Sequence, residues 1–140
     1  MKHDPLLTVA RLRRLARDEA RQELSRALVV EAAASARADD ATRQIADETA
    51  AASSLMGDDS MVDAFATWLP GARQHAAAAR AASERASAEV GRMRAILTVS
   101  RTAAESVETL LAQRAAMQAE DRGRRLQAEL DEVGRGAMPD

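Results

Sequence analysis

A regular alternation of apolar and polar positions runs through the second half of the chain, between Phe65 and Leu111. Apolar or small residues recur there at alternating spacings of four and three, with no charged residue among them. A repeat of about 3.5 residues held over this length is typical of a left-handed coiled coil, since a straight helix drifts from it by ~20° per heptad. The pattern therefore predicts a long helix that needs a partner helix. The stripe comprises Phe65, Leu69, Ala72, Ala76, Ala79, Ser83, Ala86, Val90, Met93, Leu97, Ser100, Ala104, Val107 and Leu111.

A second, less regular stripe runs through the first half of the chain. Asp4 and Pro5 suit the N-cap and the first turn of a helix, and no further Pro or Gly occurs before residue 55. We therefore expect a first helix at about residues 5–55, with Glu48 as the one charged residue on its stripe. This stripe comprises Val9, Leu12, Ala16, Ala20, Leu24, Ala27, Val30, Ala34, Ala38, Ala41, Ile45, Glu48, Ala52 and Leu55.

A cluster of turn-forming residues separates the two stripes. Gly57 suits the position after a helix, and Asp58, Asp59 or Ser60 suits the cap of the next one. A turn near residues 56–60 makes the two helices antiparallel neighbours. The sequence thus predicts an all-α fold, one long antiparallel two-helix coiled-coil hairpin in a single domain, in which facing residue numbers sum to about 120. Leu55 then faces Phe65, and Val9 faces Leu111.

The distribution of charge favours the same pairing. Net charge is +3 over residues 1–30, −6 over 31–63, +4 over 64–104 and −3 over 105–140. A hairpin places each block beside one of opposite sign, whereas a parallel homodimer places each beside its like. Exposed ion pairs contribute only a few tenths of a kcal/mol each, but their arrangement selects orientation.

Two features should disturb the second helix, expected at about residues 60–134. Pro70 lies inside it and removes a backbone hydrogen bond, so we expect a kink or a short break at residues 66–71. Gly134, Gly136 and Pro139 should end it. Because residue 1 faces about residue 119, residues 120–140 should form an overhang of at most ~30 Å without a partner in the chain.

Composition excludes several classes of protein. The chain of 140 residues has no Cys, 1% aromatic residues and a net charge of −2. We therefore expect no disulfide and no thiolate metal site. No apolar run is long enough for a transmembrane helix, and we expect no signal peptide, because the start lacks an apolar core.

Few residues are candidates for chemistry. The two histidines, His3 and His75, are far apart, and Asp58, Asp59 and Asp63 lack the spacing of a calcium loop. No phosphate-binding loop and no nucleophile motif occurs. We expect no catalytic residue, no cofactor and no metal site.

Two basic clusters are candidates for partner binding, and each is either a solvated helix face or a docking surface. An apolar edge, Leu126, Leu130 and Val133, follows the second cluster. Nearby acidic residues and the lack of interleaved aromatic residues disfavour nucleic acid as the partner. The clusters are Arg11, Arg13, Arg14 and Arg17, and Arg122, Arg124 and Arg125.

The chain also resembles the FliJ family, the small stalk proteins of the flagellar type III export apparatus. The resemblance covers nearly the whole chain, and related stalk proteins of virulence type III secretion share the same two-helix layout. It lies in Pro5-Leu6-Leu7, Leu12-Arg13-Arg14-Leu15, Asp18-Glu19-Ala20-Arg21-Gln22-Glu23-Leu24, Phe65-Ala66-Thr67-Trp68-Leu69 and Arg73-Gln74.

This resemblance implies a cytoplasmic protein, peripheral at the inner face of the cell membrane. It implies that the end bearing both termini enters the ring of the hexameric export ATPase. It also implies that Phe65, Leu69 and Ala72 match a surface that contacts the cytoplasmic domain of the export gate, and that export chaperones are further partners.

Together with the predicted rod, the resemblance implies a non-enzymatic stalk and coupling protein of flagellar protein export. The basic clusters with Leu126 and Leu130 are its expected ATPase-binding residues. The alternatives are a virulence secretion stalk, a coiled-coil spacer or adaptor unrelated to export, and a protein that binds nucleic acid or membranes through its basic end.

Overall fold

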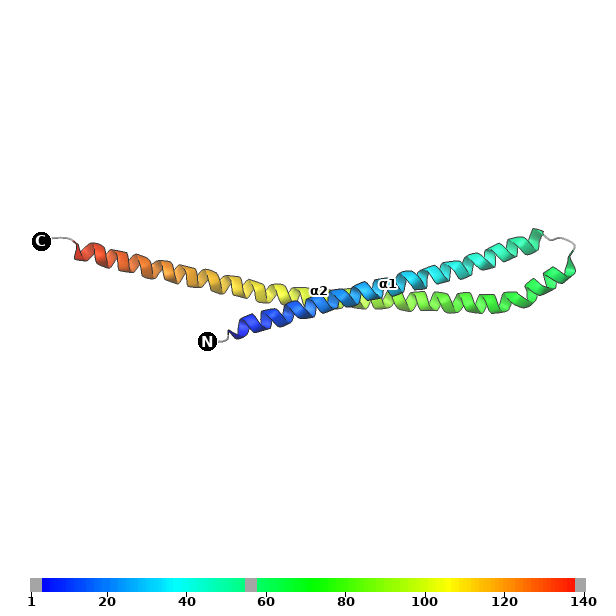
Figure 1. Ribbon diagram of the computed structural model, residues 1–140, viewed down its shortest axis with the longest axis horizontal. Coiled ribbons are helices and arrows are strands. Elements are labelled where there is room, and N and C mark those ends of the chain that lie inside the picture. Colours follow the sequence, from blue (N-terminus) through cyan, green and yellow to red (C-terminus); the bar gives the residue numbers. More distant parts are fainter. Residues whose placement is uncertain (1–3, 55–57, 138–140) are drawn as a thin grey trace. The chain divides into compact units, whose positions relative to one another are not determined.

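Two long helices form the fold. The structure, a computed structural model, describes residues 4–54 and 58–137. It contains α1 (Pro5–Ser54) and α2 (Asp59–Gly136), and these residues include no strand (Figure 1). The predicted all-α hairpin is confirmed, with helix bounds within one or two residues of those expected. Residues 56 and 57 of the expected turn lie outside the described residues, and so does Leu55, whose expected partner is Phe65.

Capping residues fix where both helices begin. The backbone N–H of Leu6 donates to Asp4 Oδ1 at 3.0 Å, and those of Leu7 and Thr8 donate to the Asp4 carbonyl oxygen. Asp4 is thus the N-cap of α1, as predicted, and Pro5 occupies the first helical position, where its missing N–H costs nothing. At α2, the Asp58 carbonyl oxygen accepts from the N–H of Val62, and its carboxylate accepts from the Ser60 hydroxyl.

The contacts between the helices fall into two units. We call residues 1–18 and 99–140 the terminal unit and residues 19–98 the middle unit. In the terminal unit, ion pairs join Asp4 to Arg114 and Arg14 to Glu108, whose residue numbers sum to 118 and 122. In the middle unit, Ala41 and Ala79, which sum to 120, line the same groove. The helices are therefore antiparallel in each unit, in the predicted register.

The stripe predicted on α2 is the interface with α1. Every position of this stripe, from Phe65 to Leu111, is buried or half-buried. Val90 is 2% exposed, Leu97 8% and Ala104 1%. The uninterrupted spacing of four and three therefore identified the buried face of α2 correctly.

The stripe predicted on α1 is wrong in its N-terminal part and again at Val30, which is 59% exposed while its neighbour Glu31 is half-buried. Val9 and Leu12 are 39% and 59% exposed, and Ala16 is exposed as well, whereas Ala10 is 2% exposed and Arg17 is half-buried. The buried and half-buried residues follow one phase of alternating four and three, interrupted at Arg13 and Glu48, which are in phase but exposed. The apolar residues at the start of the chain do not follow this phase. At the start of α1, the heptad phase therefore decides which residues are buried, even where the apolar residues lie out of phase. Its buried and half-buried seam positions are Leu6, Ala10, Arg17, Ala20, Leu24, Ala27, Glu31, Ala34, Ala38, Ala41, Ile45 and Ala52.

Pro70 bends α2 without breaking it. The helix is continuous through residues 66–71, so the expected alternative of a short break is wrong. Figure 1 shows α2 curving in its green segment, which contains Pro70. A proline inside a helix removes one hydrogen bond and pushes away the carbonyl four residues back, and this produces a bend.

The interface contains little bulk. The buried apolar residues of the described chain are seven alanines with Val90, Leu97 and Val107, and none of its buried residues is polar or charged. Alanine lets helix axes approach closely, but each buries far less apolar area than leucine. The helices are therefore held together by many small contacts spread along their length.

Candidate partner-binding surfaces

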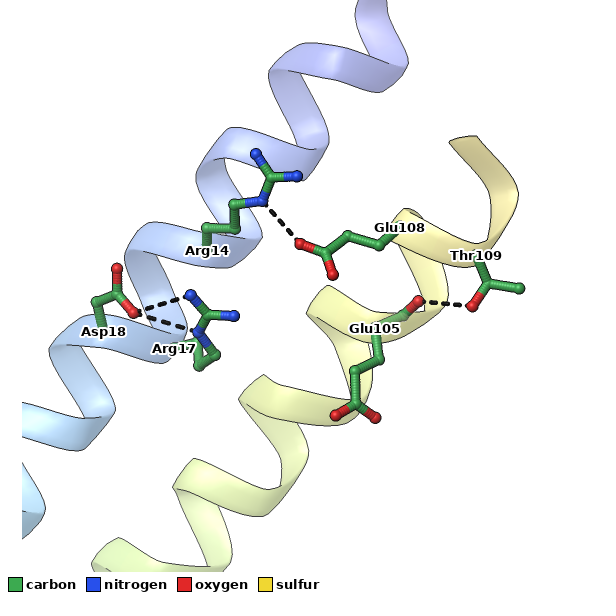
Figure 2. Close-up of polar contacts among 6 residues, drawn as sticks. All are labelled: Arg14, Arg17, Asp18, Glu105, Glu108 and Thr109. Atoms are coloured by element: carbon green, nitrogen blue, oxygen red, sulfur yellow. Dashed lines mark hydrogen bonds and ion pairs between the residues drawn. The ribbon is translucent and has the colours of Figure 1, made fainter. Parts of the chain in front are cut away.

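The first basic cluster lies on α1 in the terminal unit and is partly neutralised. Arg14 Nε donates to Glu108 Oε1 at 2.8 Å, across the two helices (Figure 2). Arg17 donates through Nε and Nη2 to Asp18 Oδ1 at 3.2 and 3.1 Å. Arg11 and Arg13 are exposed and take part in no ion pair between described residues. These two guanidinium groups are the part of the cluster that is free to bind an anionic partner.

The second basic cluster lies on α2 in the same unit and shows the same division. Arg124 pairs with Glu120 at 2.6 Å and approaches Asp121 at 3.9 Å. Arg122 and Arg125 are exposed, and no ion pair among the described residues includes them. Each basic cluster therefore offers two uncompensated guanidinium groups, fewer than the sequence suggests.

The two clusters do not form one surface. The Arg14–Glu108 pair places Arg11 and Arg13 beside residues near 109 to 111 of α2. At a rise of 1.5 Å per residue, Arg122 lies ~17 Å farther along the helix. The structure thus brings both clusters into the terminal unit, as predicted, but separates them along α2. A partner that contacts both must extend along the helix.

An exposed apolar edge continues α2 beyond the reach of α1. Leu126, Leu130 and Val133 are 60%, 63% and 71% exposed. Asp4, at the start of α1, pairs with Arg114, so no described residue of α1 lies opposite this edge. The orange and red part of α2 in Figure 1 carries it. These three large apolar side chains lie on one uncovered helix face and form a candidate surface for a partner.

The residues matched to an export-gate contact lie near the other end of α2, in the middle unit. Phe65 and Leu69 are half-buried, and so is Ala72. The Phe65 and Trp68 rings lie 5.8 Å apart at a tilt of 38°. Together with Glu48 and Ala52 of α1, they line a shallow groove of about 290 Å³. The three matched residues are therefore partly used in helix packing, and Trp68 adds an aromatic ring beside them.

Polar chemistry is sparse in the described residues. No cluster of three His, Asp or Glu side chains has the geometry of a metal site in the described part of the chain, Asp58, Asp59 and Asp63 included. His75 lies beside a groove of about 350 Å³ lined largely by alanines of both helices. His3 lies outside the described residues.

The arginines of both clusters were predicted from the sequence, but their acidic partners were not. Glu108 and Asp4 are the acidic residues that cross-pair the terminal unit, with Arg14 and Arg114. Both pairs could have been predicted from the antiparallel register, because each joins residues of opposite charge whose numbers sum to about 120. Trp68 was missed as a neighbour of Phe65, although a spacing of three places both on one helix face.

Comparison with known proteins identifies no relative. No protein-family model matches the chain, and neither a curated protein nor a solved structure does. Within residues 4–54 and 58–137, neither helix contains a stretch long and apolar enough to cross a bilayer.

Proposed function

We propose that the chain is a non-enzymatic coupling protein of the flagellar protein-export apparatus. Its terminal unit docks in the ring of the export ATPase, at the inner face of the cell membrane. A second surface, around Phe65, Leu69 and Ala72, contacts the cytoplasmic domain of the export gate, and export chaperones are further partners. The sequence resemblance to FliJ-type stalk proteins supplies the identity of these partners.

The uncovered edge of α2 is the observation that supports ATPase docking most. Leu126 and Leu130 expose more than half of their surface, and burial of a leucine contributes about 1.5–3 kcal/mol. A narrow helix that carries apolar residues and flanking arginines is complementary to a partner surface that is apolar with acidic groups beside it. Arg122 and Arg125 lie next to the edge and add charge attraction.

Exposed rings on α2 support a second contact. Phe65 and Trp68 are only half-buried and line an open groove, so a partner can still cover them. Aromatic residues are enriched at protein interfaces relative to the rest of the protein surface.

Binding to the purified export ATPase and stimulation of its ATP hydrolysis test the proposal. We expect Leu126→Asp/Leu130→Asp, and removal of residues 121–140, to weaken both readouts at least tenfold. Arg11→Gln/Arg13→Gln should weaken ATPase binding by a smaller factor. At high salt this variant and the unchanged chain should bind equally, because salt screens the lost charges.

Two matched variants control for charge and exposure. Val29 and Val30 are 70% and 59% exposed in the middle unit, so Val29→Asp/Val30→Asp repeats the apolar-to-acid change elsewhere. Arg37→Gln/Arg43→Gln repeats the loss of two cations. Neither should alter ATPase binding. Full ATPase binding by the Leu126/Leu130 variant contradicts the proposed docking end. If the ATPase binds no form of the chain, a spacer unrelated to export becomes the better assignment.

A further inference from the structure

The uncovered face of α2 is longer than its three large side chains suggest. Small and large apolar residues recur along it at the strict alternation of four and three that marks the buried seams. All of them are exposed, and the described part of α1 covers none beyond Arg114. We call this set the tail stripe. It comprises Ala112, Ala116, Ala119, Gly123, Leu126, Leu130, Val133 and Ala137.

The tail stripe is long enough to pair with another helix. It spans residues 112–137, which is just under four heptads and ~39 Å at 1.5 Å per residue. Apolar heptads sustained over three to four repeats indicate a coiled coil. The stripe is offset from the Phe65–Leu111 seam, so it does not simply continue the interface with α1.

Side-chain size along the tail stripe is graded in one direction. The first half carries Ala116, Ala119 and Gly123, and the second half carries Leu126, Leu130 and Val133. A parallel copy would pair large with large and small with small, which leaves half of the interface without bulk. An antiparallel copy pairs each large residue with a small one.

The antiparallel register is self-consistent over the whole stripe. Gly123 faces Leu126 of the second copy, Ala119 faces Leu130, and Ala116 faces Val133. In each pair the residue numbers sum to 249, and the ends Ala112 and Ala137 obey the same sum. Each layer then contains one small and one larger side chain, apart from the alanine pairs at the ends, so the two helices can run at constant separation.

Charge selects the same orientation. Arg122 and Glu129 flank the tail stripe on one side, are exposed, and take part in no ion pair between described residues. In an antiparallel coiled coil, positions on this side face their counterparts, so Arg122 of each copy meets Glu129 of the other. A parallel pairing instead places Arg122 beside Gln127, and Glu129 beside Gly134.

We propose that the tail stripe is a self-association site, on which a second copy of this chain docks antiparallel in the register that sums to 249. The inference goes beyond the proposed function, because it concerns the chain alone and needs no export component. It also has a consequence for that function, since a paired tail cannot present Leu126 and Leu130 to another partner.

Sedimentation of the full chain over a concentration series from micromolar to millimolar measures the self-association. We expect a monomer–dimer equilibrium that Leu126→Asp/Leu130→Asp weakens at least ~100-fold, because four leucines leave the interface. Leu12 and Leu15 provide the matched control. They are 59% and 57% exposed in the same unit, and Leu12→Asp/Leu15→Asp should leave the dimer unchanged.

Charge reversal tests the orientation. Arg122→Glu alone and Glu129→Arg alone should each weaken the dimer by about 3- to 10-fold, since two ion pairs become two repulsions. Mixing the two variants should restore association, because antiparallel pairing then places two glutamates against two arginines. Parallel pairing predicts no recovery on mixing.

A disulfide test fixes the register, since the chain has no cysteine of its own. Ala119→Cys/Leu130→Cys should oxidise to a covalent dimer. The two positions lie ~16 Å apart within one helix, too far for an internal bond. Ala119→Cys alone should remain uncrosslinked. The proposal is overturned by a monomer at millimolar concentration, by an undiminished dimer of the Leu126/Leu130 variant, or by efficient crosslinking of Ala119→Cys alone.

Discussion

Leucines in two regions of α2 differ in burial. Leu97 lies on the Phe65–Leu111 stripe and is 8% exposed, whereas Leu126 and Leu130 lie on the tail stripe and are 60% and 63% exposed. Both regions repeat apolar residues with the same 3.5-residue period. They differ because residues of α1 lie opposite the first region and none of its described residues lies opposite the second.

This difference separates two kinds of information in a helical sequence. Heptad spacing specifies that a face is to be buried against a helix, but it does not specify which helix covers it. Length and register decide that question, because α1 begins opposite Arg114. Where the chain supplies no cover, the same spacing becomes a binding surface for another molecule.

The largest expected effect comes from truncating one leucine in each region. Leu97→Ala should lower the free energy of unfolding by about 2–3 kcal/mol, the lower part of the range for buried leucines, since a two-helix interface relaxes easily. Leu130→Ala should change it by less than about 0.5 kcal/mol in dilute solution. Urea unfolding followed by circular dichroism measures both. Equal losses would show that the tail is covered.

Enlarging an alanine gives the converse comparison. Ala104 is 1% exposed, so Ala104→Leu should overpack the interface and cost about 1–3 kcal/mol. Ala119 is exposed, and Ala119→Leu should leave the unfolding free energy of the monomer nearly unchanged. Thermal melts at low concentration compare the two variants. A destabilised Ala119→Leu monomer would contradict the open tail.

The sequence was sufficient to predict α2 and insufficient for the start of α1. On α2, every stripe position from Phe65 to Leu111 is apolar except Ser83 and Ser100, which are small and uncharged, so the residue pattern and the heptad phase coincide. On α1, Val9 and Leu12 are apolar but out of phase, and the phase imposed by the rest of the helix buries Ala10 and half-buries Arg17. The apolar residues Val9 and Leu12 therefore stay exposed, because a helix is rigid and its first turns cannot rotate independently of the rest.

For the candidate surfaces, the sequence predicted which residues are involved and at which end of the hairpin they lie, but not which of them are paired. The arginine clusters lie in the terminal unit as expected, but the state of each guanidinium depends on side-chain contacts such as Arg14 with Glu108 and Arg17 with Asp18. On the tail, Leu126 and Leu130 stand out in the sequence by their size, whereas Ala119 and Gly123 continue the same spacing with small side chains. Small residues bury little apolar area, so only their regular spacing shows that they belong to the stripe.

Replacing a glycine in each region should have a smaller effect. Gly91 and Gly123 both lie in helix interiors with open space around an added Cβ, so Ala fits at each position and raises helix stability by about 0.5–1 kcal/mol. For Gly91→Ala this gain should appear in the unfolding free energy, because the surrounding helix is paired. For Gly123→Ala it should appear as slower amide exchange along the tail. Hydrogen exchange and melting together distinguish the two, and a gain in global stability from Gly123→Ala would indicate that the tail unfolds with the paired helices.

The smallest expected effect concerns the boundary between the covered and uncovered regions, where Asp4 meets Arg114. The Leu6 N–H and the Arg114 guanidinium hydrogen-bond the Asp4 carboxylate, and they hold its pKa below the ordinary value of 3.8. Because the folded-state pKa is the lower one, the stabilisation is present at neutral pH and is lost as pH falls below about 4. The protection of the first-turn amides of α1, which is the slowing of their exchange relative to the intrinsic rate at the same pH, should therefore decrease over that range.

Two variants separate the cap from the ion pair. Asp4→Asn keeps an oxygen that accepts from the Leu6 N–H but carries no charge, so the protection of the first-turn amides should no longer change with pH between about 5 and 2. Arg114→Gln should move the Asp4 pKa, measured by NMR, back toward its ordinary value while leaving the cap in place. If neither variant changes the pH profile, then Asp4 does not hold the start of α1 against α2. The boundary between covered and uncovered α2 would in that case lie closer to the Arg14–Glu108 pair, and the uncovered face available to a partner would be correspondingly longer.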